Sequence, residues 1–244
     1  MYPLRPIIII PSRMNSVRLP CKPMAMIGKD PMIVHVWRQA CAASVAPVVV
    51  ACDHEDIADA IKSVGGNVVI TKKEHPTGSD RLAEAIDLFD PLGEYTHVIN
   101  VQGDLPHFPS SVLGSILDPF SMNHVDMTTF IQEKDLNNPN SAGAVSVRIQ
   151  VVHTPEGKSW IHCQDFTRNA WDSPYAHLGV YAFRREILKK FAAWSQTPRE
   201  LSESLEQLRV LDKNTIIAGI LLGKEPFISV DTPEDLERAR AYGA

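Results

Sequence analysis

The sequence predicts an α/β fold in which helices cover a mostly parallel central sheet. Between residues 7 and 70, short apolar runs alternate with stretches of helical periodicity in the order strand, helix, strand, helix, strand. Strands joined in this way are parallel, because each helix returns the chain to the edge where the previous strand began. The length of 244 residues is enough for one sizeable core of this class.

The first apolar run, residues 7–10, has four isoleucines and predicts a buried strand ending at Pro11, which cannot donate to a sheet ladder. The loop that follows carries three cations, Arg13, Arg18 and Lys22. Ligands of open α/β sheets bind beyond the carboxyl ends of strands, so these cations would line a crevice for an anion such as a phosphate chain. A solvated surface loop is the alternative that charge alone leaves open.

The next elements follow from periodicity and capping signals. A helix is expected over residues 32–43, a strand over 47–51, a helix from an N-cap at Asp53 to residue 63, and a strand over 67–70. Thr77 or Ser79 would cap a further helix to residue 89, and the free N–H groups there suit an anion or a base edge. A plain capped helix explains the same residues.

A strand over residues 96–101 would deliver Asp104 to the same edge of the sheet, beside a glycine that permits a tight turn. A carboxylate there suits a divalent metal held against phosphate, or equally a turn. Beyond it we expect a helix over 109–122, strands over 125–131, 145–152, 160–163 and 177–183, and a polar segment over 133–141.

On the strand over 177–183, His177, Gly179, Tyr181 and Phe183 share one face by alternation, and a half-buried strand with a satisfied histidine explains them as well. A helix over 202–211 and strands over 215–221 and 227–230 complete the pattern. Asp231 or Thr232 would cap the last helix. The chain shows no linker, so we expect a single domain, residues 1–244, with residues 133–215 forming an inserted portion.

Composition and charge exclude several classes of protein. The 44% hydrophobic and 22% charged residues are ordinary for a soluble globular chain, and the first apolar stretch lacks the length and cleavage site of a signal peptide. The net charge of −5 argues against a nucleic-acid partner. The four cysteines form no C-x-x-C pair, which argues against a zinc knuckle. We expect a cytoplasmic protein without membrane insertion.

Several segments, taken together, resemble one family. Residues 11–23, P-S-R-M-N-S-V-R-L-P-C-K-P, resemble the P-A-R-x-x-S-x-R-L-P-G-K-P signature of cytidylyltransferases that make CMP-activated sugar acids. Residues 77–84, 98–104, 177–183, 205–211 and 230–236 are similar to further segments of the 3-deoxy-manno-octulosonate (Kdo) cytidylyltransferase family, in the same order. The departures are Cys21 for glycine, Leu105 for glutamate, and a short segment after Trp171.

The resemblance implies a Rossmann-like three-layer nucleotidyltransferase fold, a homodimer formed through residues 133–215, and an activity that transfers CMP from CTP to Kdo. It implies Mg²⁺ held by Asp104 and Asp231, with Arg13, Arg18 and Lys22 acting on the phosphates. The implied CTP-binding residues are Pro11, Ser12, Arg13, Ser16, Lys22, Thr77, Gly78, Ser79, Arg81 and Gln102. The implied sugar-binding residues are Gln102, Arg168, His177, Tyr181, Glu206 and Gln207.

Three hypotheses follow from the sequence. The first is Kdo cytidylyltransfer, in which CMP-Kdo would serve lipopolysaccharide synthesis. The second keeps the fold but changes the sugar acid, to 8-amino-Kdo or a sialic acid, as the short segment after Trp171 allows. The third is a nucleotide-binding homologue without catalysis, although the full set of carboxylates and cations gives such a protein little physical need for them.

Overall fold

A computed structural model describes residues 3–16, 18–134, 145–155, 157–169, 173–224 and 226–242. The chain forms two compact units: unit 1 comprises Met1–Gly114 and Pro226–Ala244, and unit 2 comprises Ser115–Glu225. Unit 2 begins earlier and ends later than the inserted portion expected over residues 133–215. The sugar-binding and dimer-forming role of that portion stays a prediction.

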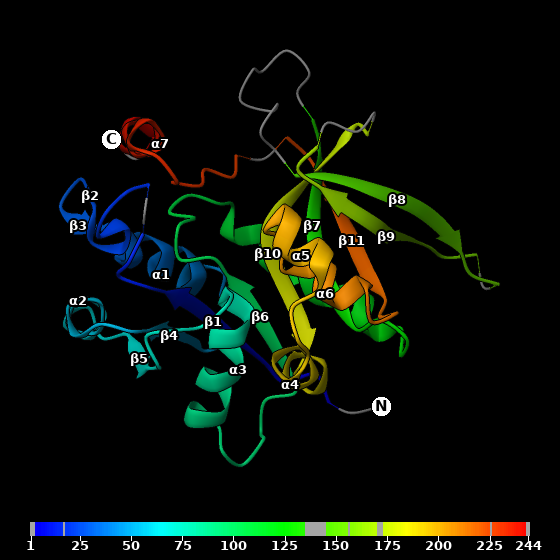
Figure 1. Cartoon of the computed structure of the whole chain (residues 1–244), viewed down its shortest axis with the longest axis horizontal. Helices are drawn as coiled ribbons and strands as arrows, with labels where there is room; N and C mark the ends of the chain where they lie inside the picture. Colours follow the sequence, from blue (N-terminus) through cyan, green and yellow to red (C-terminus); the bar gives the residue numbers. More distant parts are fainter. Residues whose placement is uncertain are drawn as a thin grey trace. The chain divides into compact units, whose positions relative to one another are not determined.

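Unit 1 is built on a parallel sheet with strand order β5-β4-β1-β6 (Figure 1). All three pairings in it are parallel, which confirms the prediction for this part of the chain. Helices α1, α2 and α3 lie between the strands in sequence and pack on the sheet. The elements are β1 (Pro6–Ser12), α1 (Met32–Ala42), β4 (Val48–Cys52), α2 (Glu55–Ser63), β5 (Asn67–Ile70), α3 (Gly78–Phe89) and β6 (His97–Val101).

Strand β1 runs through Pro11, so the expectation that the strand ends there is wrong. The backbone N–H of Ile8 donates to Pro47 O, on the side of β4. Because successive residues of a strand direct their N–H groups to alternate sides, Pro11 faces β6. Pairing with β6 ends at Ile9, so the missing N–H of Pro11 costs no ladder hydrogen bond.

The helix caps agree with the sequence in one case and correct it in another. Thr77 caps α3, with its hydroxyl accepting from Asp80 N, as one of the two alternatives predicted. Asp53 does not cap α2: that helix begins after His54, whose ring nitrogen accepts from Asp56 N. The Asp53 carboxylate is therefore available for other partners.

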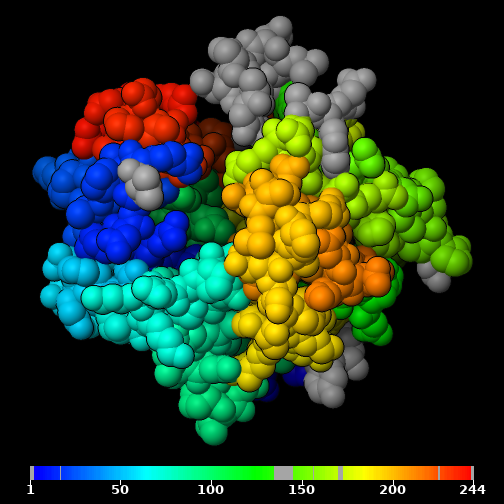
Figure 2. All heavy atoms as spheres, viewed as in Figure 1, coloured from blue at the N-terminus to red at the C-terminus, as the bar shows by residue number. Residues whose placement is uncertain are grey.

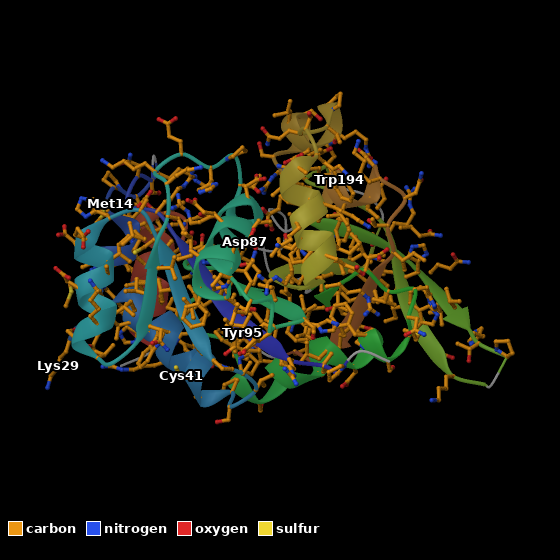
Figure 3. The ribbon with its side chains drawn as sticks, turned by 90° about the horizontal axis from the view of Figure 1, so that it is seen from below. Met14, Lys29, Cys41, Asp87, Tyr95 and Trp194 are labelled. Carbon is orange, nitrogen blue, oxygen red and sulfur yellow. The ribbon has the colours of Figure 1, made fainter. Side chains whose placement is uncertain are left out.

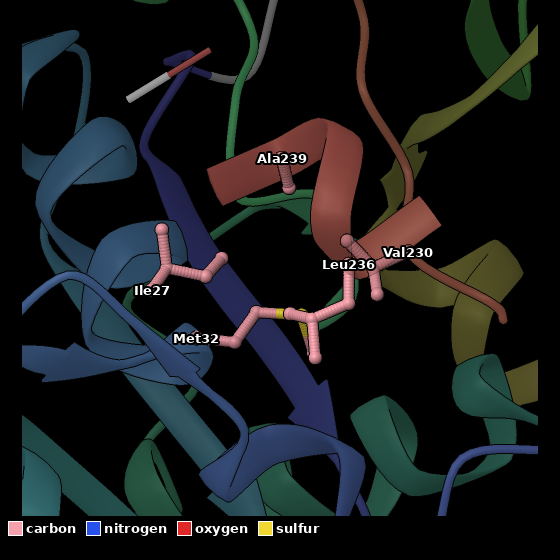
Figure 4. Close-up of a cluster of buried hydrophobic side chains, with 5 residues drawn as sticks. All are labelled: Ile27, Met32, Val230, Leu236 and Ala239. Atoms are coloured by element: carbon pink, nitrogen blue, oxygen red, sulfur yellow. The ribbon is translucent and has the colours of Figure 1, made fainter. Parts of the chain in front are cut away.

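The last helix, α7 (Pro233–Tyr242), packs in unit 1 on the short strand β2 (Met26–Ile27), which pairs with β3 (Asp30–Pro31), and its red atoms lie beside blue ones in Figure 2. A small apolar cluster holds it there (Figure 4). The strand expected over residues 227–230 is wrong, because this segment has only an isolated bridge between His107 and Ile228. The members of the cluster are Ile27, Met32, Val230, Leu236 and Ala239.

Unit 2 contains a sheet with strand order β10-β7-β11-β9-β8, in which β7 and β11 are parallel and the other neighbours antiparallel. The helix expected over residues 109–122 is present as η2 (Ser110–Ser121), a 3-10 helix that contains Pro119, a residue unfavourable in an α-helix interior. The strands are β7 (Met127–Glu133), β8 (Ser146–His153), β9 (Ser159–Thr167), β10 (Tyr175–Arg184) and β11 (Ile217–Leu222). Helix α4 (Arg185–Ala193) follows β10.

The single helix expected over residues 202–211 is also wrong. The segment forms α5 (Pro198–Glu203) and α6 (Gln207–Leu211), separated at Ser204, which has a left-handed φ of 52°. The break lets Arg209 turn back onto Glu200, with 2.8 Å from Nε to Oε2, and both side chains are buried. No helix of the described residues is long and apolar enough to cross a membrane.

Candidate active site

The carboxyl edge of the unit 1 sheet brings together three of the predicted catalytic residues. Lys22 opens the short 3-10 helix η1 (Lys22–Met24), Asp104 follows β6, and Asp231 precedes α7. The Lys22 ammonium donates to Asp104 Oδ2 at 2.7 Å, to Asp231 Oδ1 at 3.1 Å and to Val230 O at 3.0 Å. Asp104 and Asp231, which lie 82 and 209 positions from Lys22 in the sequence, thus contact the same ammonium group.

Two backbone links fix the segment that carries Asp231. Val230 is fully buried, and its N–H donates to Asp104 O at 2.8 Å. Asp235 accepts from the N–H groups of Asp231 and Thr232, and Thr232 Oγ1 accepts from Asp235 N, which forms a capping box. Thr232 is therefore the cap, and the Asp231 side chain is left to the site.

Arg18 joins the same cluster through an ion pair of 3.0 Å to Asp231, but its side chain is 66% exposed. Exposed pairs of this kind contribute little to stability, so this contact does not fix the Arg18 side chain. Arg13 is exposed, and Ser16 is half-buried. Their predicted contacts with CTP stay predictions.

The ends of β1, α3 and β6 meet closely beside this cluster. A Cβ atom placed on Gly103 would lie 2.5 Å from Pro11 O, and one placed on Gly78 would lie 3.5 Å from Pro11 Cγ and 3.6 Å from Gln102 Oε1. At Gly103 only glycine allows this approach without a shift of the backbone, whereas at Gly78 a Cβ atom would make ordinary van der Waals contacts. The hydroxyl of Ser12 is buried and has no hydrogen-bond partner among the described residues. Predicted CTP-binding residues from three separate elements therefore gather at one edge.

The two departures from the family signature in unit 1 have structural consequences. Cys21 has φ 53° and ψ 32°, in the left-handed region where glycine is unstrained and other residues are not. Cys21 is exposed, so its side chain finds space. Leu105 is 5% exposed and belongs to the apolar core, so its position offers no polar group to a ligand.

Arg81 is held by the protein itself. Its guanidinium donates to Thr71 Oγ1 at 2.6 Å, to Lys72 O at 3.0 Å and to Lys73 O at 3.1 Å. Burial lowers the pKa of Arg81, and the nearby charge of Arg13 adds to this effect. The contacts describe a residue that fixes the loop before α3, and a direct contact with CTP stays a prediction. Ser79 is buried in the first turn of that helix.

In unit 2, the predicted sugar residues form a second cluster on β10 and α6. The ring of His177 stacks on that of Tyr181, with centroids 5.2 Å apart, and Tyr181 Oη donates to Gln207 Oε1 at 3.2 Å. The register of β10 slips between residues 178 and 181, which places Gly179 in an irregularity and keeps the three rings of His177, Tyr181 and Phe183 together. The shared face is thus confirmed for the three ring-bearing residues.

The tautomer of His177 follows from its neighbour. Thr129 Oγ1 has one proton, which it donates to Val180 O at 2.8 Å, so the contact of 3.0 Å with His177 requires Nε2 to be the donor. Burial, helped by the charge of Arg168, lowers the pKa of His177 to about 3. The ring is therefore neutral at physiological pH, and Nδ1 is a hydrogen-bond acceptor.

The remaining sugar residues differ in how firmly they are held. Burial raises the pKa of the Tyr181 hydroxyl well above its usual value, and the charge of Glu206 raises it further, so the hydroxyl stays protonated and keeps its hydrogen bond to Gln207. Gln207 is buried, and its Nε2 has no partner among the described residues. Arg168 is exposed and donates to Glu203 O at 2.9 Å. Trp171 and its neighbour Asp172, in the segment expected to be short, lie outside the described residues.

Three contributors were missed by sequence reasoning: the Val230 carbonyl, Thr129 and Asp53. A backbone carbonyl has no sequence signal. Thr129 is one threonine in an apolar strand, and Asp53 was assigned to a helix cap. Only the fold brings them to their partners.

The parallel sheet with cations and carboxylates at its carboxyl edge defines a nucleotide-binding α/β protein. A family model described as cytidylyltransferase matches residues 7–217. A 3-deoxy-manno-octulosonate cytidylyltransferase of Methylorubrum populi is 41% identical over 96% of this chain and 95% of its own length. One of Paramagnetospirillum magneticum is 41% identical over 99% and 98%. The chain belongs to the 3-deoxy-manno-octulosonate cytidylyltransferase family.

Solved structures agree. A CMP:2-keto-3-deoxy-manno-octonic acid synthetase complexed with CTP superposes with a TM-score of 0.82 and 30% identity over 98% of both chains. A cytidylyltransferase from Leptospira borgpetersenii has a TM-score of 0.63 at 16% identity, covering 98% of this chain and 86% of its own. The second likeness supports the fold alone.

Proposed function

We propose that the protein transfers CMP from CTP to the anomeric hydroxyl of 3-deoxy-D-manno-octulosonate and releases pyrophosphate. The observation that carries the proposal is the convergence of Asp104, Asp231 and Lys22 at the carboxyl edge of the sheet. It occurs in a chain whose relatives have this activity in their names and whose structural neighbour was solved with CTP. The product CMP-Kdo would serve lipopolysaccharide synthesis.

In the reaction, the anomeric oxygen attacks the α-phosphorus of CTP, and the bond from that phosphorus to the β-phosphate oxygen breaks. Such a transfer asks for positioning and charge neutralisation more than for a protein nucleophile. Arg13, Arg18 and Lys22 would bind the triphosphate and stabilise the charge that develops on the leaving pyrophosphate. Around them, Pro11, Ser12, Gly78 and Gln102 would receive the nucleotide.

The residues present fit a magnesium ion. Two carboxylates and the Val230 carbonyl already surround one cationic group, at 2.7 to 3.1 Å from Lys22 Nζ. Mg²⁺ is commonly held by one or two carboxylates together with substrate phosphates. Asp104 and Asp231 would hold it here. Bound Mg²⁺ would polarise phosphate oxygens and lower the pKa of the attacking hydroxyl.

The sugar acid would be bound by residues of unit 2. His177 Nδ1 is an acceptor, and Tyr181 Oη, whose one proton is donated to Gln207 Oε1, is a second acceptor, while the buried Nε2 of Gln207 is a donor without a partner among the described residues. A polyhydroxylated ligand supplies partners for all of these groups. Arg168 offers a positive charge for the carboxylate of the sugar acid.

One assay tests the activity. Protein, CTP and Mg²⁺ are mixed with Kdo, 8-amino-Kdo or a sialic acid, and pyrophosphate release is followed. Release with Kdo at the highest kcat/KM supports the proposal. Preference for another sugar acid would reassign the substrate, and no release with any of them would leave a nucleotide-binding protein without catalysis.

Two further parts of the proposal concern the cellular setting. The four cysteines are all free thiols, in keeping with the reducing cytoplasm. The family resemblance supports a homodimer. Light scattering after size-exclusion chromatography measures the mass directly, and a mass of one 27.1 kDa chain at micromolar concentration would contradict the dimer.

A further inference from the structure

Asp53 is a buried carboxylate between the first loop and the loop before α3. It directly follows β4, and its side chain is 7% exposed. Oδ1 accepts a hydrogen bond of 2.9 Å from the backbone N–H of Met14, which is labelled in Figure 3. Oδ2 lies 3.4 Å from Nη2 of Arg81. One carboxylate thus joins two segments that are 28 and 39 residues away in the sequence.

The Arg81 end of this link is fixed. The guanidinium is 4% exposed and binds Thr71 Oγ1 and two backbone carbonyls in addition to Asp53. A cation with this many directional donors in use cannot swing away without leaving buried groups unpaired. Asp53 is therefore held in one position by a group that is itself held.

The Met14 end determines the course of the first loop. Met14 immediately follows Arg13, and it comes two residues after β1 ends at Ser12. Met14 lies beyond the end of β1, and among the described residues the Asp53 carboxylate is the one hydrogen-bond acceptor found for its N–H. Since consecutive residues share a peptide plane, fixing the Met14 N–H also fixes the carbonyl end of Arg13.

We propose that Asp53 is a positioning residue: held by Arg81, it fixes the Met14 amide and thereby aims the Arg13 side chain at the triphosphate. The inference rests on the proposed function, because it assigns Arg13 to the phosphates of CTP. Asp53 itself touches no substrate. Small displacements of a group that orients a substrate reduce rates strongly, which gives a buried tether its value.

The alternative is that Asp53 serves only to compensate the charge of Arg81. Two substitutions separate the two roles. Asp53→Asn keeps the Oδ1 acceptor for Met14 N–H but removes the charge opposite Arg81, whereas Asp53→Ala removes both. Asp90→Ala is the matched control: Asp90 is a buried carboxylate of unit 1 that accepts from Glu94 N and Tyr95 N, and Tyr95 lies well away from Met14 in Figure 3.

The first measurement is hydrogen exchange at the Met14 amide in the full-length protein without ligand. We expect protection in the wild type and in Asp53→Asn, faster exchange in Asp53→Ala, and unchanged Met14 exchange in Asp90→Ala. An unprotected Met14 amide in the wild type would overturn the proposal without any variant, so the test survives if Asp53→Ala fails to fold.

The second measurement is the KM for CTP and kcat with saturating sugar acid. We expect Asp53→Ala to raise the KM for CTP about tenfold and to lower kcat, Asp53→Asn to recover most of both, and Asp90→Ala to leave the KM for CTP unchanged. If Asp53→Asn changes the KM for CTP and kcat as much as Asp53→Ala does, the role of Asp53 is charge compensation, and the proposal fails. If the wild type neither binds nor turns over CTP, the proposed function fails, while exchange at Met14 still tests the tether.

Discussion

Lys22 Nζ lies 2.7 Å from Asp104 Oδ2 and 3.1 Å from Asp231 Oδ1, so a single lysine bridges the two carboxylates proposed to hold magnesium. The Lys22 side chain is 14% exposed, so its ammonium group is largely shielded from water. Lysine and Mg²⁺ would compete for the same carboxylate oxygens. When Mg²⁺ and CTP bind, the Lys22 ammonium would therefore exchange its contacts with the carboxylates for contacts with the phosphates.

The carboxylates themselves are tested by Asp104→Asn and Asp231→Asn. Both side chains lie at the sheet edge and are partly exposed, so we expect the fold to remain and kcat to fall by at least about 100-fold. Circular dichroism checks the fold, and initial rates over a range of Mg²⁺ concentrations check the role. Asp87→Asn, at an exposed position of α3, is the control. A variant with near-normal kcat at limiting Mg²⁺ would remove that residue from the metal site.

Because Lys22 would compete with Mg²⁺ for the carboxylates, its removal should strengthen Mg²⁺ binding and lower kcat. Lys22→Met should tighten Mg²⁺ binding to the nucleotide-free protein about fivefold, because removal of a partly exposed competing cation is worth about 1 kcal/mol. The same variant should lower kcat about 100-fold through loss of a contact to the phosphates. Calorimetric titration with MgCl₂ measures the first effect.

Lys29→Met is the matched control for Lys22→Met, since Lys29 is an exposed lysine of unit 1 (Figure 3). It should change neither Mg²⁺ binding nor kcat. Weaker Mg²⁺ binding in Lys22→Met than in the wild type would show that Lys22 organises the carboxylates instead of competing for them.

The buried pair of Glu200 and Arg209 predicts a large effect on stability. The Arg209 guanidinium also lies 4.0 Å from the centre of the Phe191 ring, in the interior of unit 2. Arg209→Leu leaves the Glu200 charge buried without its partner and should cost about 3–5 kcal/mol of unfolding free energy, measured by urea denaturation at pH 7. The double variant Glu200→Met with Arg209→Leu should recover much of this loss.

The sign of the pH dependence follows from Glu200. Burial raises its pKa, but hydrogen bonds led by that from Arg209 outweigh burial and hold the pKa below the usual value. The stabilisation is therefore present above the pKa of an unfolded glutamate and is lost as the pH falls through the lower pKa of the folded state. Arg199→Ala, which breaks partly exposed pairs with Asp165 and Asp212, should change stability by only about 1 kcal/mol.

Local signals in the sequence predicted local structure well. The isoleucine run of β1 and the hydroxyl of Thr77 specify a strand and a helix start through neighbours within a few residues. The errors have non-local causes. Residues 227–230 form an irregular segment that pairs with His107 and Asp104, and the break at Ser204 accompanies the burial of Arg209 on Glu200.

The candidate site shows the same division. Resemblance indicated Lys22, Asp104 and Asp231 individually, and the fold brings them into contact. The sequence predicts that Asp53 caps the helix that follows it, because a cap is the role that the neighbouring residues alone indicate. Its partners, Met14 and Arg81, become neighbours only when β1, β4 and α3 assemble, so no pattern in the sequence reports the contact.

The sugar cluster gives the last prediction. Gln207 accepts from Tyr181 Oη at 3.2 Å through Oε1, and its buried Nε2 has no partner among the described residues. A buried amide group without a partner is unfavourable by about 1–3 kcal/mol, which a ligand hydroxyl would offset. Gln207→Ala should therefore raise the KM for Kdo about tenfold while leaving the KM for CTP within about twofold. Gln150→Ala, which removes an exposed contact with Gln164, should change neither constant.

A second substitution separates the two ends of the Gln207 amide. Tyr181→Phe removes only the donor to Oε1, so Oε1 becomes available to the ligand and Nε2 is unaffected. If Nε2 is the group that binds the sugar, Tyr181→Phe should be milder than Gln207→Ala in its effect on the KM for Kdo. Equal effects would mean that the Tyr181 hydroxyl fixes the amide in place. A rise in the KM for CTP with none for Kdo would assign this cluster to the nucleotide and move the sugar site elsewhere.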